Sequence, residues 1–412
     1  MDERTLFRMA LGLDDPWEVK EIKFDAEKQQ LDIYMDFPKG SKFLCPECDQ
    51  LCGVHDTIQK TWRHLNFFQH LTYLHARVPR IKCAEHGVKT VSVPWARSGA
   101  GFTLLFEALI MTFAKNGMTP KAISRLVGEH DTRIWRVLEH YVETSRAKED
   151  FSSVSMVGVD ETSRAKGHTY VTLFADMEKR KVIFVTEGKD HSTIESFKQD
   201  LEEHGGDASK VTDFSIDMSK AFIKGIGEEF ENAAITFDKF HVIKIINDAV
   251  DEVRRAEQTL CPELKKTRYV WLKNEDNLTD NQREIYKELK DSTLKTARAR
   301  RIKDMLQKLY EQPAEDAPAH LKRWYFWATH SRLTPIIKAA KTIKAHWDGV
   351  MRWFESGLNN GFMEGINSLV QAAKARARGY RSTKKMKVMI YLIAGKLSFD
   401  LPRVMPYATH TK

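Results

Sequence analysis

The chain has 412 residues, of which 42% are hydrophobic and 30% are charged. This composition excludes a collagen-like, low-complexity or fully disordered chain, and the length suggests two or three domains. No run of about 18 apolar residues occurs and the N-terminal stretch lacks the apolar segment of a signal peptide, so we expect no membrane partner. Five cysteines in so long a chain argue against a disulfide scaffold and favour a reducing cytoplasm.

The net charge of +8 is concentrated near the C-terminus. Residues 365–412 contain ten Lys or Arg and one acid, and so carry +9, whereas the other 364 residues sum to −1. A dense basic segment is typical of a surface that binds nucleic-acid phosphates, although a solvated basic helix has the same composition. The candidate DNA-binding residues in this segment are Lys374, Arg376, Arg378 and Arg381.

The N-terminal region combines strand patterns with metal-ligand pairs. Alternating apolar and polar residues predict a β-hairpin over 17–37, with further strands over 67–80 and 88–93. Each of the two pairs, Cys45/Cys48 and Cys83/His86, has two intervening residues, so one tight turn can direct both side chains at one ion. Four such ligands predict a closed, structural zinc site. The alternative ligands are Cys52, His55 and His64.

Residues 118–142 have the pattern of a helix-turn-helix unit, after a first helix over about 102–113. Thr119 can cap the helix that begins at Pro120, and Gly128 lies in the short turn before the next helix. Any helical hairpin shows similar patterning, but in a DNA-binding unit the second helix lies in the major groove. The exposed residues of that helix, which are candidate DNA contacts, are Thr132, Arg133 and Arg136.

From residue 154 the pattern changes to that of an α/β layer. β-Branched and aromatic runs predict strands over 154–159, 168–176, 181–186, 211–216 and 233–237, with helices before each of the last two. The order βββαβαβ predicts a mixed sheet covered by helices. From Lys239 onward nearly everything is helical, and residues 250–345 contain no strand pattern.

Three acids occupy positions typical of a metal site. Asp160 is predicted to end the first strand of this sheet and Asp217 the fourth, while Glu364 begins a helix after a glycine-containing loop. Sites in open α/β sheets collect at strand ends, and hard oxygen ligands suit Mg²⁺ or Mn²⁺. Two such ions can activate the attacking oxygen and stabilise the leaving oxygen in phosphodiester chemistry. The alternative is that each Asp is a turn residue or helix cap.

Asp238 and His241 lie three residues apart after the fifth strand. They can meet on the first turn of a helix and support the acidic site. The alternative is an N-capping Asp followed by an ordinary helical His.

Taken together, these blocks resemble a bacterial insertion-sequence transposase of the ISL-three group, a branch of the DDE transposases. The resemblance covers nearly the whole chain and rests on CPEC with CAEH, VGVDET, IDMSKAF, FDKFHV and NNGFMEGINSLVQAAKARARGY. It implies a multidomain α/β protein with an RNase H-like core, in which Asp160, Asp217 and Glu364 match the catalytic triad. His86 stands where a Cys is more familiar.

The element pattern and the resemblance together predict five segments. We expect a zinc-binding β module (1–95), a helix-turn-helix region (96–150), the first part of the RNase H-like core (151–249), an all-helical insertion (250–345) and the rest of the core with a basic helix (346–412).

The resemblance implies a DNA transposase that binds the ends of its insertion sequence, cleaves phosphodiester bonds with Mg²⁺ or Mn²⁺, and joins the 3′ ends to target DNA. Because two ends must be brought together, we expect a homodimer or larger oligomer on double-stranded DNA, at the nucleoid in the bacterial cytoplasm. Two alternatives remain open: a non-catalytic DNA-binding regulator derived from a transposase, and an RNase H-like nuclease without strand transfer.

Overall fold

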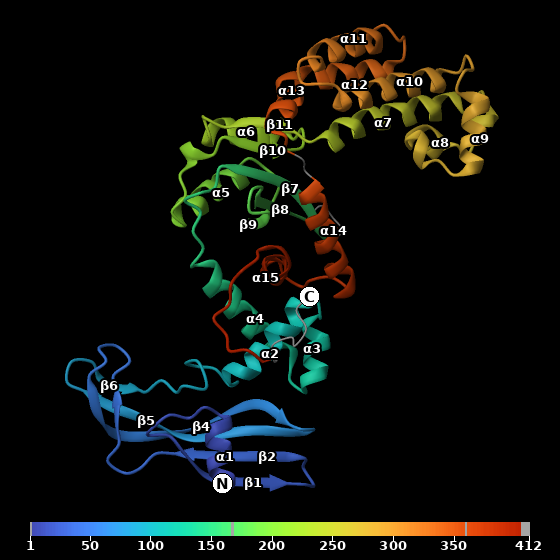
Figure 1. The fold of residues 1–412 in the computed structure, drawn as a ribbon. Coiled ribbons are helices and arrows are strands. Elements are labelled where there is room, and N and C mark those ends of the chain that lie inside the picture. Colours follow the sequence, from blue (N-terminus) through green and yellow to red (C-terminus); the bar gives the residue numbers. More distant parts are fainter. Residues whose placement is uncertain (1, 166–168, 359–360, 405–412) are drawn as a thin grey trace. The chain divides into compact units, whose positions relative to one another are not determined.

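The computed structural model describes residues 2–165, 169–358 and 361–404. The chain forms two compact units, one of Met1–Glu143 with Ser398–Lys412 and one of Thr144–Leu397 (Figure 1). Within the described residues, no helix is both long enough and apolar enough to cross a membrane.

The first unit contains helix α1 (Glu3–Ala10) and a sheet in the order β1-β2-β5-β4-β3, with β6 paired to β5. The strands are β1 (Glu18–Asp25), β2 (Gln30–Asp36), β3 (Lys42–Leu44), β4 (Leu51–Phe67), β5 (His70–Cys83) and β6 (Gly87–Thr90). The predicted hairpin is confirmed, because β1 and β2 pair antiparallel. The 17-residue strand β4 was not predicted, since its first half is largely exposed and lacks a clear apolar face.

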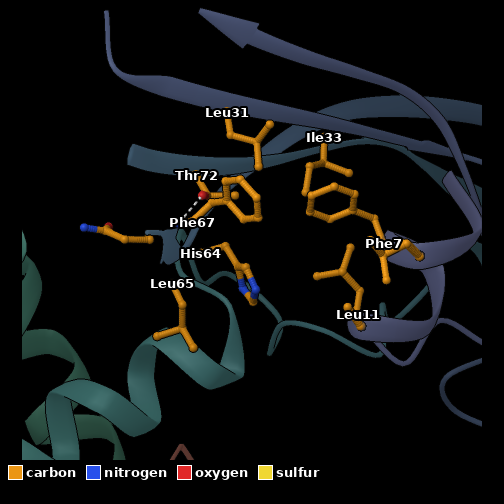
Figure 2. A pocket seen from close by; sticks show the side chains of 11 residues that line it. Phe7, Leu11, Leu31, Ile33, His64, Leu65, Phe67 and Thr72 are labelled. Atoms are coloured by element: carbon orange, nitrogen blue, oxygen red, sulfur yellow. Dashed lines mark hydrogen bonds between the residues drawn. The ribbon is translucent and has the colours of Figure 1, made fainter. Parts of the chain in front are cut away.

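An apolar pocket of about 300 Å³ lies between α1 and this sheet (Figure 2). Phe7 of α1 and Leu11 just after it line the pocket together with Leu31 and Ile33 of β2. His64 also lines the pocket, and its Nδ1 lies 2.9 Å from the hydroxyl of Thr103. Burial lowers the pKa of His64 to about 4, so this ring is neutral near pH 7.

The predicted helix-turn-helix unit is present in the same part of the chain. It consists of α3 (Pro120–Val127) and α4 (Asp131–Arg146), which follow α2 (Leu104–Lys115). The Thr119 hydroxyl accepts a hydrogen bond from the Ala122 N–H, and Gly128 ends α3 with a left-handed φ of 71°. Both local signals predicted from the sequence therefore work as expected.

The second unit is built on a five-stranded sheet in the order β11-β10-β7-β8-β9. The strands are β7 (Met156–Ala165), β8 (Thr169–Asp176), β9 (Lys181–Glu187), β10 (Asp213–Ile216) and β11 (Ala234–Phe237). The pairs β7–β8 and β8–β9 are antiparallel, and β10 lies parallel to both β7 and β11. The mixed sheet and its βββαβαβ order are confirmed, with α5 (Ser192–Glu203) and α6 (Lys220–Glu229) at the predicted places.

One predicted strand boundary is wrong. Strand β7 continues to Ala165, so Asp160 lies inside the strand and not at its end. The polar residues after Asp160 remain extended because they pair with β8 in a long hairpin, as Glu161 does with Thr172.

Helices fill most of the remaining chain. They are α7 (Lys239–Glu257), α8 (Arg268–Leu272), α9 (Asp280–Leu289), α10 (Lys295–Gln307), α11 (Ala317–Thr329), α12 (Thr334–Ala345), α13 (Trp347–Ser356), α14 (Gly361–Arg376) and α15 (Thr383–Ala394). Trp271 and Trp324 are fully buried core residues, and the Trp324 indole N–H donates to the Ile302 carbonyl. The segment boundary expected at residue 250 falls inside α7.

The two faces of strand β7 pack against different helices. Val157 and Val159 belong to the apolar core that also contains Phe197 of α5. Gly158 points to the other face, where an added Cβ would lie 3.2 Å from Met363 of α14. Successive strand residues alternate in direction, so Asp160 shares the face of Gly158 and α14. This alternation directs the acid toward α14, the helix that carries Glu364. Figure 1 shows α14 beside β7.

Candidate functional site

Four side chains of the first unit converge on one point. Ligand atoms of Cys45, Cys48, Cys83 and His86 all lie within 4.8 Å of one another. The Sγ atoms of Cys48 and Cys83 are 3.7 Å apart, and His86 Nδ1 lies 3.7 Å from Cys83 Sγ and 3.9 Å from Cys45 Sγ. A tetrahedral zinc ion with Zn–S bonds of about 2.3 Å places neighbouring sulfur ligands about 3.8 Å apart. The cluster therefore fits zinc.

Two turns that follow paired strands form this cluster. Cys45 and Cys48 lie in the turn between β3 and β4, while Cys83 ends β5 and His86 immediately precedes β6. The backbone N–H groups of His86 and Glu85 lower the pKa of the Cys83 thiol to about 6, which favours the thiolate that binds a metal.

The alternative zinc ligands lie outside this cluster. The Cys52 thiol donates instead to the Gln50 carbonyl, at 3.4 Å, and His64 lines the apolar pocket. The four-residue group found in the described chain contains neither of them, nor His55. The geometry therefore favours His86 as the fourth ligand.

Three aspartates of the second unit lie level with one another: Asp160 within β7, Asp217 directly after β10 and Asp238 directly after β11. Ser215 of β10 pairs with Gly158 of β7, so Asp217 and Asp160, each two residues further on, are level. Ile216 pairs with Phe237, which makes Asp217 level with Asp238. The backbone thus gathers three carboxylates at one edge of the sheet.

Helix α14 carries Glu364 and is tied to strand β7 by polar side chains on one helix face. Asn367 Nδ2 donates to Asp160 Oδ2 at 2.6 Å, Gln371 Nε2 to the Thr162 hydroxyl at 2.7 Å, and Lys374 Nζ to the Ser163 carbonyl at 2.6 Å. The other amide atom, Asn367 Oδ1, is buried without a hydrogen-bond partner among the described residues. An unsatisfied acceptor therefore lies beside the acids.

The electrostatics of this edge favour a cation. Burial, together with the charges of Asp217 and Asp238, raises the pKa of Asp160 from its ordinary 3.8 to about 6. Burial and the charges of Asp217 and Asp160 raise the pKa of Glu161 to about 7. Mutually repelling, partly desolvated carboxylates are a suitable donor set for a hard divalent ion.

Asp238 and His241 form a hydrogen-bonded pair next to these acids. His241 Nδ1 lies 3.0 Å from Asp238 Oδ2, and this bond raises the pKa of the imidazole, assisted by the charges of Asp238, Asp217 and Asp160. The Asp238 side chain makes no capping bond to α7, although it precedes the helix. The geometry therefore favours a supporting pair over the capping alternative.

Glu364 approaches the same group from the first turn of α14. Burial raises its pKa, and the charge of Asp238 raises it further. Among the described residues, the four zinc ligands are the group of at least three His, Cys, Asp or Glu side chains whose ligand atoms lie close enough together to hold one ion. Asp160, Asp217 and Glu364 are not part of such a group, so their carboxylates do not form a closed metal cage in this structure.

The three candidate DNA contacts on α4 have different environments. Thr132 and Arg136 are exposed. Arg133 is held within the protein, because it forms an ion pair with Glu129, donates to the Gly101 carbonyl at 3.2 Å and lies 4.0 Å from the centroid of the Phe102 ring. Of the two arginines, Arg136 is the better placed to reach DNA.

The candidate basic residues after Glu364 also differ in their environments. Lys374 is bound to strand β7, so its ammonium group helps to dock α14. The helix ends at Arg376, and Arg378 lies beyond it with a left-handed φ of 56°. The expected single basic helix is therefore interrupted, while Arg376, Arg378 and Arg381 are exposed.

Comparison with known proteins places these features in one family. A transposase model of the ISL3 group matches residues 157–390, which is more than half of the chain and includes Asp160, Asp217 and Glu364. The chain belongs to the ISL3 transposase family. Two further models match: the helix-turn-helix domain of transposase family ISL3 over residues 91–142, and the zinc finger of the IS204/IS1001/IS1096/IS1165 transposases over residues 41–86. The zinc-finger match includes all four clustered ligands, so model and geometry together support a structural zinc site.

Full-length relatives of this ISL3 transposase include curated insertion-sequence transposases. The transposase for insertion sequence element IS1557 from Mycobacterium tuberculosis is 25% identical over 428 aligned positions that span 94% of each chain. The transposase for IS1001 from Bordetella parapertussis is 27% identical over 386 positions, covering 90% of this chain and 94% of the relative.

Sequence reasoning missed several residues at the acidic site of this ISL3 transposase. Asn367 and Gln371 were not singled out, and Lys374 was expected to bind DNA. The three follow helical spacing of four and three, a polar stripe that could have indicated a docked face. Glu161 was indistinguishable from Asp213 in the sequence. In the structure Asp213 is paired with Arg352 at 2.9 Å, whereas Glu161 interacts with the acids.

Proposed function

We propose that this transposase binds the ends of its insertion sequence, cleaves phosphodiester bonds there with divalent metal ions, and joins the freed 3′ ends to target DNA. The observation that carries the proposal is the row of Asp160, Asp217 and Asp238 on or directly after neighbouring strands, with the Glu364 helix tied to the first of them. That arrangement lies within the part of the chain matched by the transposase model.

In this proposal Asp160 and Asp217 are ligands of Mg²⁺ or Mn²⁺, and Glu364 completes the site. The metal supplies activation of the attacking oxygen and charge neutralisation at the phosphate. Asn367 orients Asp160, and the bond to Asp238 raises the pKa of His241, whose protonated form would reduce repulsion among the acids. Because the carboxylates do not form a closed cage in this structure, Glu364 is expected to move closer when metal and DNA bind.

The other regions supply DNA recognition. The zinc module and the helix-turn-helix unit would recognise the element ends, with Thr132 and Arg136 on the exposed side of α4. Arg376, Arg378 and Arg381 follow Glu364 in the chain and would bind phosphates near the cutting site. Two ends must be joined in one reaction, so a homodimer or larger oligomer on DNA is expected.

The test is excision and joining of a marked element that carries the DNA ends flanking this gene. The wild-type protein is compared with Asp217→Asn, with and without Mg²⁺. We expect the wild type to cleave and join only when Mg²⁺ is present, and the activity of the variant to be lower by more than about 100-fold. Glu195→Gln, which removes one exposed negative charge from α5, is the matched control and is expected to stay active.

The outcomes separate the alternatives. Cleavage without joining would indicate an RNase H-like nuclease, and specific end binding without cleavage would indicate a regulator. Equal activity of Asp217→Asn and wild type would remove Asp217 from the metal site.

A further inference from the structure

One helical hairpin of the second unit carries positive charge without any acid. Residues 317–345, which form α11, α12 and the turn between them, contain six Lys or Arg and no Asp or Glu. The preceding helical residues 239–316 contain seventeen Lys or Arg against fifteen Asp or Glu. The hairpin carries +6 in 29 residues, against +2 in the preceding 78, so it is a second basic segment, separate from the one at the C-terminus.

The six cations all lie on the outside of the hairpin. Leu321 and Trp324 bury the inner face of α11, and Ile336 and Ala340 bury that of α12. At 100° per residue, Lys322 and Arg323 of α11 and Lys338 and Lys341 of α12 fall on the side opposite these buried residues, and Lys344 lies on the flank of α12. The exposed cations are Lys322, Arg323, Arg332, Lys338, Lys341 and Lys344.

These cations have no acidic partners in the described chain. Some basic residues of the preceding helices form ion pairs, as Arg254 does with Asp251 and Arg300 with Asp304. Lys344 instead lies 4.1 Å from the centroid of the Trp347 ring. Three lysines at intervals of three on α12 repel one another, which disfavours an isolated helix. A bound polyanion would relieve that repulsion.

We propose that the outer surface of α11 and α12 binds the phosphate backbone of double-stranded DNA independently of its sequence. The choice of DNA as the partner rests on the proposed function, since a transposase must hold both element and target DNA. Lysine and arginine heads on two neighbouring helices fit a backbone, which carries one charge per about 1.7 Å of duplex. This basic surface is distinct from the helix-turn-helix, which lies mainly in the first compact unit of the chain.

The test measures binding of the full-length protein to a labelled duplex of arbitrary sequence, without divalent cations and over a range of salt concentrations. The variant carries Lys338→Gln, Lys341→Gln and Lys344→Gln. The matched control carries Lys265→Gln, Lys287→Gln and Lys308→Gln, which remove the same charge from exposed positions before the hairpin. Each lost phosphate contact lowers the slope of log affinity against log salt by about 0.9.

We expect the α12 variant to lower that slope by about 2 to 3 and to weaken binding on the order of tenfold or more, with no change in the control. Lys322→Gln with Arg323→Gln is a second variant, expected to lower the slope by about 2. Equal melting temperatures show that the variants are folded.

Wild-type affinity and slope in both variants would overturn the proposal, and so would an equal loss in the control. Failure of the proposed function is recognised differently, by a wild-type protein that binds DNA but neither cuts nor joins it with Mg²⁺. A wild type that binds no DNA would overturn both.

Discussion

The side-chain amide of Asn367 donates a 2.6 Å hydrogen bond to a carboxylate oxygen of Asp160, across 207 positions of the chain. Lys374, seven residues further along α14, reaches Ser163, three residues further along β7. Seven helical residues and three strand residues both span about 10 Å, so the spacing of these contacts along the helix matches their spacing along the strand. Glu364 lies one turn before Asn367 and is positioned by the same register.

Asn367→Ala is expected to reduce cleavage by about 10- to 100-fold and to raise the Mg²⁺ concentration needed for half-maximal activity, because a ligand loses its orienting partner. A Mg²⁺ titration of cleavage provides the measurement. Ser368→Ala, at an exposed position of the same helix, is the control. An unchanged Mg²⁺ requirement in Asn367→Ala would show that the bond to Asp160 has no role in metal binding.

Asp160→Asn is expected to abolish cleavage and yet stabilise the metal-free protein near neutral pH. Folding raises the pKa of Asp160 from 3.8 to about 6, so it favours the uncharged carboxyl. The stabilisation from this group is fully present below about pH 4 and is lost as the pH rises through about 6, a difference of about 3 kcal/mol.

Melting temperatures of the two proteins, measured without divalent cations, check this prediction. The variant should melt higher at about pH 7.5 and show no advantage at about pH 4, where the wild-type carboxyl is already protonated. A wild-type protein that melts higher at neutral pH would contradict it.

Cys45→Ser is expected to release zinc and unfold the β3–β6 region, since a small module of this kind depends on its metal. Cys52→Ser should still bind one zinc ion per chain, because the Cys52 thiol lies outside the cluster and donates to the Gln50 carbonyl. Zinc content and thermal melting distinguish the two. Loss of zinc from Cys52→Ser with retention in His86→Ala would reassign the fourth ligand.

Gly349→Ala is expected to destabilise the second unit by about 1–3 kcal/mol through overpacking. The added Cβ would lie 2.4 Å from the Phe237 ring and 3.0 Å from the Ile235 carbonyl, so α13 would be pushed from β11. Gly227→Ala, an exposed helical position with no atom within 4 Å of the new Cβ, should instead stabilise by about 0.5–1 kcal/mol. Urea unfolding compares them, and equal effects would refute the packing argument.

Signals that act within a few residues were sufficient to predict much of this protein. The zinc pairs depend on tight turns, Thr119 and Gly128 bound α3 through local backbone geometry, and the short buried strands are rich in β-branched residues. Strand β4 was not predicted, because its exposed first half lacks the alternating apolar residues by which a strand is recognised in a sequence.

The sequence by itself therefore determined the order of elements, the zinc ligand pairs and the acids that can form a site. Only the tertiary structure decided that the charges of Asp217 and Asp160 help to raise the pKa of Glu161 while Asp213 pairs with Arg352, and that Lys374 docks a helix. These outcomes depend on contacts between residues far apart in the chain, such as the one from Lys374 to Ser163 across 211 positions. Such contacts follow from the shapes of two packed surfaces and leave no local pattern in the sequence.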